Sequence, residues 1–253
     1  MSDTEVAMTT PASSTAKPPR PRLPAQLVAL VAPDVGMPRV AREGKARWAL
    51  LFAMLCSLAF AGAQATRVSA REETLQQLEM SGQLKDMSDR QIEEQAKSSE
   101  HKFVVKTAAA ALFKEPLLCL AYLICLYALS WFLRGRSNGG AIAAVSAAAL
   151  LPGALRDLLS AGAALMHSTL PTEGPPLVPS TFNQISALLG HPMMGMLAPL
   201  GNALDLFSLW AALLFGFGLA AAASLSRTRA LAGTLVAWTL WRLLYACAFH
   251  LGG

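Results

Sequence analysis

The sequence has few charged side chains and none of the short motifs of the common catalytic and nucleotide-binding sites. Lys, Arg, Asp and Glu together make up only 15% of its 253 residues. It contains no His-Glu-x-x-His metal helix, no Gly-x-Ser-x-Gly elbow, no phosphate-binding loop and no Gly-x-Gly-x-x-Gly following a strand. These absences exclude the zinc proteases, hydrolases, NTPases and dinucleotide enzymes that carry such motifs. We expect a non-enzymatic protein without a cofactor.

Candidate metal ligands and redox-active cysteines are also sparse. Each of these two residue types occurs four times: His101, His167, His191 and His250, and Cys56, Cys119, Cys125 and Cys247. The histidines are scattered over expected loops and the C-terminal end, without ligand spacing, so no metal site is predicted. The cysteines all fall within apolar stretches and are most simply small apolar residues.

The sequence is instead rich in long apolar runs. Hydrophobic residues make up 54% of the chain, and its mean hydropathy is +0.42. The run from Leu206 to Ser226 has 21 residues without a charge, enough for a helix to cross a hydrocarbon core about 30 Å thick. We predict an all-α polytopic membrane protein, a bundle of five transmembrane helices. The expected spans are about 48–66, 116–133, 139–164, 205–225 and 230–250.

The net charge of +5 is explained by topology, so no nucleic-acid partner is predicted. Four basic residues precede the first span: Arg39, Arg42, Lys45 and Arg47. Arg134 and Arg136 follow the second span, and Arg227 and Arg229 follow the fourth, whereas 167–204 has no Lys or Arg. Because basic residues favour cytoplasmic loops, we expect a cytoplasmic N-terminus and an extracytoplasmic C-terminus, with the lipid bilayer as the chain's first partner.

The regions outside the spans are expected to differ in character. Residues 1–46 contain many prolines and few large apolar side chains, which indicates a disordered, Pro-rich cytoplasmic tail with a short surface helix over 27–32. Residues 167–204 are expected to form an outer loop. Within it, 181–200 has prolines and glycines that break a straight span, so it is interpreted as an interfacial helix or a re-entrant segment.

Residues 67–114 are predicted to form an extracytoplasmic amphipathic helical hairpin broken near Ser81-Gly82. Ser88 and Gln91 have the spacing of a capping box, so the second helix is expected from Asp89 to about His101. Its apolar stripe is either a docking surface for another protein or the inner face of a solvated spacer. The candidate docking residues are Leu75, Leu78, Leu84, Met87 and Ile92.

The third span contains a candidate helix kink at Pro152 and Gly153. On the expected topology, four charged residues of the spans lie toward the outer side of the bundle: Arg156, Asp157, Asp205 and Arg242. Ionisable groups within a membrane are costly, about 2.5 to 3.5 kcal/mol each on insertion scales, and they usually pair or line a cavity. The cluster is either a set of ion pairs that fixes helix packing or a polar pathway or binding cleft. A third alternative is that the charges nearest the interface extend toward the headgroups.

The stretch Leu204-Asp205-Leu206-Phe207-Ser208-Leu209-Trp210, the basic link at Ser226-Arg227 and the last span with Trp238 and Trp241 resemble bacterial members of the Yip family of Rab-interacting-type membrane proteins. The segment 87–95 is similar to theirs as well. The resemblance covers about 48–249 and implies a non-enzymatic protein of the bacterial inner membrane, with ABC exporters as candidate partners. The chain lacks the Asp-Leu-Tyr-Gly-Pro type motif of eukaryotic relatives, so the resemblance does not imply GTPase binding.

We therefore expect an inner-membrane scaffold or accessory subunit of a membrane complex. The alternative is a small permease or ion-coupled transporter that uses the intramembrane Asp/Arg cluster.

Overall fold

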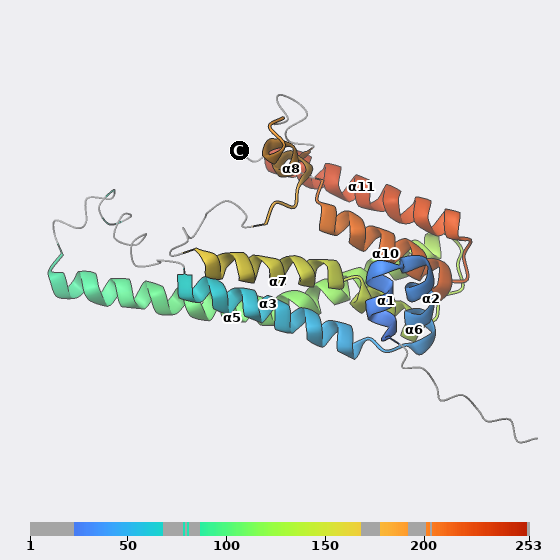
Figure 1. Ribbon diagram of the computed structural model, residues 1–253, viewed down its shortest axis with the longest axis horizontal. Helices are drawn as coiled ribbons and strands as arrows, with labels where there is room; N and C mark the ends of the chain where they lie inside the picture. The colour runs from blue at the N-terminus through green and yellow to red at the C-terminus, as the bar shows by residue number, and fades with distance from the viewer. Residues whose placement is uncertain are drawn as a thin grey trace, which may run out of the picture.

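The computed structural model describes residues 23–67, 78, 80, 87–167, 178–191, 201, 202 and 204–251, the last seven by their backbone alone. Within these residues the chain is helical and has no β-strand, only a single bridge between Thr181 and Asp205. The all-α fold class is confirmed. The helices in Figure 1 are α1 (Ala25–Val31), α2 (Pro33–Glu43), α3 (Arg47–Arg67), α5 (Asp89–Phe132), α6 (Gly139–Ala148), α7 (Leu151–Met166), α8 (Phe182–Leu188), α10 (Leu206–Ala222) and α11 (Arg227–Leu251).

Three helical segments of the described chain are long and apolar enough to cross a membrane: α3, α5 and the joined pair α6–α7. They coincide with the first three predicted spans. The fourth predicted span corresponds to α10, which has only 17 residues, and the fifth to α11, which has 25. Membrane-spanning character is therefore supported for three segments, and a five-span bundle stays a prediction.

The helices pack in two groups that meet around α10 (Figure 1). One group contains α3, which lies along α7 and α5. In the other, α11 packs along α10, and α10 in turn contacts α2, α6 and α7. The largest buried cluster lies among α2, α6 and α10 and includes Met37, Ile142 and Leu214, none of which has any exposed surface.

The predicted disordered tail is wrong for residues 25–43. These residues form α1 and α2, which pack against each other, and α2 also packs against α6 and α10. Pro33 stands in the first turn of α2, where its missing N–H costs nothing, so this proline starts a helix and does not indicate disorder. Met37 and Val40 are fully buried in the main core. The short helix expected at 27–32 is present as α1, but it packs into the bundle.

The second arm of the predicted outer hairpin is also wrong in its extent. The Gln91 side chain accepts a hydrogen bond from the backbone N–H of Ser88 at 3.0 Å, so the predicted start of the helix is confirmed. The helix does not end near His101. It continues through Pro116 to Phe132 as one element of 44 residues, about 66 Å long at ~1.5 Å per residue.

The reason for this continuity is that 103–113 is rich in Ala and other helix-compatible residues, so no local signal ends the helix before the apolar run. A 66 Å helix is about twice the thickness of a hydrocarbon core. Figure 1 shows the N-terminal half of α5 extending beyond the ends of α3 and α7. The first predicted arm, 68–86, lies outside the described residues except for Leu78 and Met80.

The third predicted span is interrupted where a kink is expected. α6 ends at Ala148, a turn occupies Ala149 and Leu150, and α7 begins at Leu151 with Pro152 in its first turn. Gly153 follows, and a Cβ there would meet no other atom within 4 Å. The break therefore lies just before Pro152 and Gly153.

Two basic links lie together at one end of the molecule. The link between α5 and α6 donates backbone hydrogen bonds from Arg136 to Ala223 (2.9 Å) and from Asn138 to Ala222 (3.2 Å), which are at the end of α10. Arg134 and Arg136 thus share this end with Arg227 and Arg229 at the start of α11. This agrees with the expectation that both basic links face the same side of a membrane.

The segment before α10 holds a short helix. In α8, Thr181 accepts a hydrogen bond from the backbone N–H of Gln184, whose side chain accepts one from Thr181 in return. Leu206 also donates its backbone N–H to the carbonyl of Ser180, at 2.8 Å, which ties this segment to the start of α10. The predicted interfacial segment 181–200 is helical over Phe182–Leu188; the stretch 192–200 lies outside the described residues.

Candidate functional site

The four charged residues predicted to meet do come together, and two more join them. Arg156 and Asp157 are on α7, Asp205 precedes α10 and Arg242 is on α11. The additional pair, Lys114 and Glu115, comes from α5. We call these six residues the ionic cluster; they are Lys114, Glu115, Arg156, Asp157, Asp205 and Arg242. With three cations and three anions, the ionic cluster has no net formal charge.

Asp205 is the centre of one half of the ionic cluster. Its Oδ2 accepts the backbone N–H of Ser208 at 2.9 Å, so the side chain caps the start of α10. The same oxygen lies 3.8 Å from Arg156 Nη1 and 3.7 Å from Arg242 Nη2. The Asp205 side chain is only 8% exposed, and its Oδ1 is buried without a hydrogen-bond partner. One carboxylate therefore holds α7, α10 and α11 together.

Lys114 is the centre of the other half. Its Nζ donates a hydrogen bond to Asp157 Oδ2 at 2.6 Å and lies 3.4 Å from Glu115 Oε1. Both carboxylate residues are 3% exposed, whereas Lys114 reaches the surface. A short charge-assisted bond of this kind is among the stronger polar contacts in proteins, and here it joins α5 to α7. Arg156 Nε, 3.8 Å from Asp157 Oδ1, connects the two halves.

The two arginines of the ionic cluster differ from Lys114 because their N–H groups do not donate hydrogen bonds to its carboxylates. Each guanidinium has five N–H donors, yet neither Arg156 nor Arg242 makes a side-chain hydrogen bond within the described residues. Their closest carboxylate oxygens lie at 3.7 to 3.8 Å, beyond ordinary hydrogen-bond distance. Their side chains remain 36% and 24% exposed. Donors thus remain free for a small acidic or polar group.

A polar cavity of about 130 Å³ adjoins these donors. Its walls include five members of the ionic cluster, with Leu150 of the turn before α7, Gly153 of α7 and Tyr122 of α5 beside them. The five charged wall residues are Lys114, Glu115, Arg156, Asp205 and Arg242. The break between α6 and α7 contributes to this space because the Gly153 position has no side chain to fill it.

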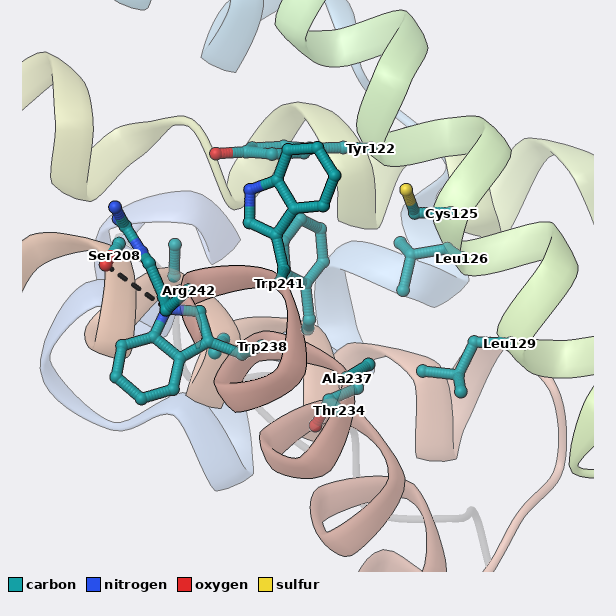
Figure 2. A pocket seen from close by; sticks show the side chains of 13 residues that line it. Tyr122, Cys125, Leu126, Leu129, Ser208, Thr234, Ala237, Trp238, Trp241 and Arg242 are labelled. Carbon is teal, nitrogen blue, oxygen red and sulfur yellow. Dashed lines mark hydrogen bonds between the residues drawn. The ribbon is translucent and has the colours of Figure 1, made fainter. Parts of the chain in front are cut away.

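A second, apolar cavity of about 200 Å³ lies beside the first and is lined by α5, α10 and α11. Figure 2 shows Cys125, Leu126 and Leu129 of α5 across from Ala237 and Thr234 of α11. The two cavities share four wall residues: Tyr122, Ser208, Ala211 and Arg242. We call the apolar cavity the α5–α11 groove.

Aromatic side chains hold the walls of the groove. Trp238 Nε1 donates to Ser208 Oγ at 3.2 Å (Figure 2), which ties α11 to the first turn of α10. Tyr122 packs edge-to-face on Phe215 with ring centroids 4.7 Å apart, a favoured aromatic arrangement. Trp241 is 67% exposed although it lines the groove. The groove is therefore open at its α11 side.

The ionic cluster lies far from the two basic links. Glu115 is 17 residues before Phe132, Asp205 precedes the 17 residues of α10, and Arg242 is 15 residues after Arg227. At ~1.5 Å per residue, these helices all place the cluster about 22 to 26 Å from the basic links. That distance is close to the thickness of a hydrocarbon core. With the links at one surface of a bilayer, the cluster lies near the other.

The sequence alone does not single out Lys114 and Glu115. One available signal was that Glu115 lies 19 residues before Arg134, a separation similar to the 22 residues between Asp205 and Arg227. Three of the five predicted docking residues are among the residues that the structure describes. Leu78 is buried, Met87 and Ile92 are half-buried, and Leu75 and Leu84 lie outside the described residues. Among the residues that the structure describes, no three His, Cys, Asp or Glu side chains are grouped to hold a metal ion.

The chain matches no protein-family model, no curated protein and no solved structure.

Proposed function

We propose that this protein is a non-enzymatic scaffold or accessory subunit of a complex in the bacterial inner membrane. The observation that carries the proposal is the length of α5. From Lys114 back to its start at Asp89 the helix continues for 25 residues beyond the ionic cluster, about 38 Å. A continuous helix of that length is a rigid arm that can reach a neighbouring protein outside the bilayer.

The surface of the arm supports this role. Val105 and Leu112, two helical turns apart on one face of the arm, are 53% and 42% exposed, so an apolar strip remains uncovered there. Toward its start, Arg90 with Glu94 and Glu93 with Lys97 form ion pairs at i,i+4 spacing, which support an exposed helix. An apolar strip on a solvated helix is the usual form of a helix that docks against a partner.

The family resemblance makes an ABC exporter a candidate partner, and the absence of a nucleotide-binding motif means that the chain itself has no recognised ATP site. The carboxylates of the ionic cluster are compensated one for one by cations. A neutral, interlinked cluster serves to hold helices in place without requiring a transported ion.

The arm is tested by comparing two single substitutions on it. Val105→Glu puts a charge on the apolar strip, while the matched control Ser98→Glu puts the same charge on an exposed polar position. Tagged full-length protein, purified from its host in mild detergent, is analysed by mass spectrometry. We expect recurrent membrane subunits to be recovered with the wild type and S98E and reduced at least five-fold with V105E. Equal recovery with all three proteins would reject the arm as the docking element.

The second candidate is a small permease or ion-coupled transporter. It is favoured by the polar cavity, which adjoins two arginines with unused donors and the unpartnered Oδ1 of Asp205. Here Asp205→Asn distinguishes the two functions. A permease loses flux while its protein level is unchanged, whereas a scaffold loses stability or assembly. If D205N shows a normal protein level and normal assembly but has lost uptake, the scaffold proposal is rejected.

A further inference from the structure

We propose that the polar cavity and the α5–α11 groove together bind one membrane lipid with an anionic headgroup. The headgroup phosphate contacts Arg156 and Arg242, and an acyl chain lies in the groove. The inference goes beyond the proposed scaffold role and does not depend on the arm of α5 or on any protein partner.

The chemistry of the headgroup follows from the donors that the cavity offers. Both guanidinium groups line the polar cavity, and neither makes a hydrogen bond within the described residues. A phosphate supplies several acceptor oxygens, and the planar guanidinium fork matches its geometry. A cation is a poorer fit because each carboxylate residue of the ionic cluster already lies within 4 Å of a cationic side chain. Asp157 is bonded to Lys114, and Asp205 Oδ2 faces both arginines and the Ser208 amide.

Asp205 also bears on which phospholipid is preferred. Its Oδ1 is a buried acceptor without a partner, and its residue lines the same cavity. Leaving a buried acceptor unbonded destabilises the folded protein, because the acceptor has lost its hydrogen bonds to water. A headgroup that carries hydroxyl groups next to its phosphate, as glycerol does, offers the missing donor. The occupant is therefore an anionic lipid of the phosphoglycerol type.

The position of an acyl chain follows from the shared walls. Tyr122, Ser208 and Arg242 belong to both cavities, so the groove begins where the polar cavity ends. Along α5 it continues from Tyr122 to Leu129, about 10 Å, toward the end of the molecule that carries the basic links. Its lining is dominated by apolar side chains, which favours a hydrocarbon occupant.

The depth of the site in a membrane is also that of a lipid headgroup. The ionic cluster lies about 22 to 26 Å from the basic links along α5, α10 and α11, close to the far boundary of a hydrocarbon core. A lipid anchored there by its phosphate extends its chains toward the bilayer centre, which is the direction of the groove. Trp238 and Trp241 line the same region, and tryptophan is enriched at membrane interfaces.

The test measures lipid retention by native mass spectrometry. Full-length protein in mild detergent is delipidated and then incubated with equal amounts of palmitoyl-oleoyl phosphatidylglycerol and palmitoyl-oleoyl phosphatidylcholine. We expect one bound phosphatidylglycerol per chain, retained at least ten-fold better than phosphatidylcholine. Arg242→Gln should reduce that preference to less than two-fold. The matched control is Arg229→Gln, on the exposed part of the same helix. This variant should retain the preference for phosphatidylglycerol over phosphatidylcholine.

A second variant tests the contribution of the groove to lipid binding independently of the contribution of the charges. Ala237 is exposed at the open side of the groove, so Ala237→Phe fills the groove and leaves every ion pair in place. We expect it to lower phosphatidylglycerol retention at least five-fold, and this result stands even where R242Q does not fold. Equal retention of the two lipids by the wild type, or full retention by A237F, would overturn the proposal. In a competition experiment, inorganic phosphate is added at the same concentration as phosphatidylglycerol. Displacement of the lipid by this phosphate would also overturn the proposal, because it would identify a site for a small anion alone.

Discussion

Substitution of Asp205 separates two contributions that meet in one carboxylate. Asp205→Asn keeps an oxygen that can accept the Ser208 amide and removes the charge between Arg156 and Arg242. Asp205→Ala removes both. The two variants therefore measure the ion pairs and the helix cap separately, with the same surrounding side chains.

The expected magnitudes follow from the geometry. Breaking a fully buried ion pair costs about 3 to 5 kcal/mol, whereas exposed pairs contribute about 0 to 1 kcal/mol. Here the carboxylate is buried but the two arginines are 36% and 24% exposed, at 3.7 to 3.8 Å. About 1 kcal/mol for each pair is reasonable, so D205N should lower the free energy of unfolding by about 2 kcal/mol. Asn caps a helix as well as Asp does, and loss of a cap costs about 1 kcal/mol. D205A should therefore lose about 3 kcal/mol.

The assay is unfolding of the purified protein in mixed micelles by titration with a denaturing detergent, followed by circular dichroism. The double variant Asp205→Asn with Arg242→Gln gives the coupling between the two residues. Its loss should be smaller than the sum of the single losses, because removing both partners leaves no buried charge unpaired. Wild-type stability in D205N would refute the structural role of the ion pairs. Equal stability of D205N and D205A would refute the cap.

Two further predictions concern glycines at helix crossings. Gly36→Ala should destabilise the protein by about 3 kcal/mol, because its Cβ would overlap the backbone nitrogen of Ala29. The substitution should also separate α1 from α2, which would appear as faster amide exchange in 25–43; an unchanged exchange rate would contradict the close crossing. Gly218→Ala should lower the free energy of unfolding by about 1 to 3 kcal/mol, because its Cβ would meet Val145 and Met37. Gly162→Ala is the control: a Cβ there would meet no atom within 4 Å, so the substitution should stabilise the protein by about 0.5 to 1 kcal/mol. The same detergent titration measures the stability of these variants. A loss of stability in G162A would show that helix propensity does not determine the effect of substitution at Gly162.

Local patterns were sufficient for much of this fold. The uncharged runs locate the membrane-competent helices, the Ser88 and Gln91 spacing marks the start of α5, and Pro152 with Gly153 marks the break before α7. Each of these features depends on hydropathy or backbone chemistry within a few residues. They can therefore be recognised without knowing what packs against them.

Errors arose where one residue type serves two structural contexts. Pro33 and Pro38 indicate disorder by composition, yet both belong to α2, because the bundle buries the apolar face that includes Met37 and Val40. Pro116 likewise stands inside a continuous helix, although a proline is expected to open one. Tertiary packing compensates for the backbone hydrogen bonds that proline lacks, and composition does not report that compensation.

The sequence by itself determined the all-helical class, the apolar spans and the presence of charges that would have to be paired. It also indicated that Arg156, Asp157, Asp205 and Arg242 would approach one another, since burying charges alone is costly. Only the tertiary structure decided which pairs form, and it added Lys114 and Glu115 from a helix whose continuation was not predicted. The two cavities beside the ionic cluster are a further product of packing, because a space between helices depends on how their side chains meet across α5, α10 and α11, and no single stretch of sequence contains that information.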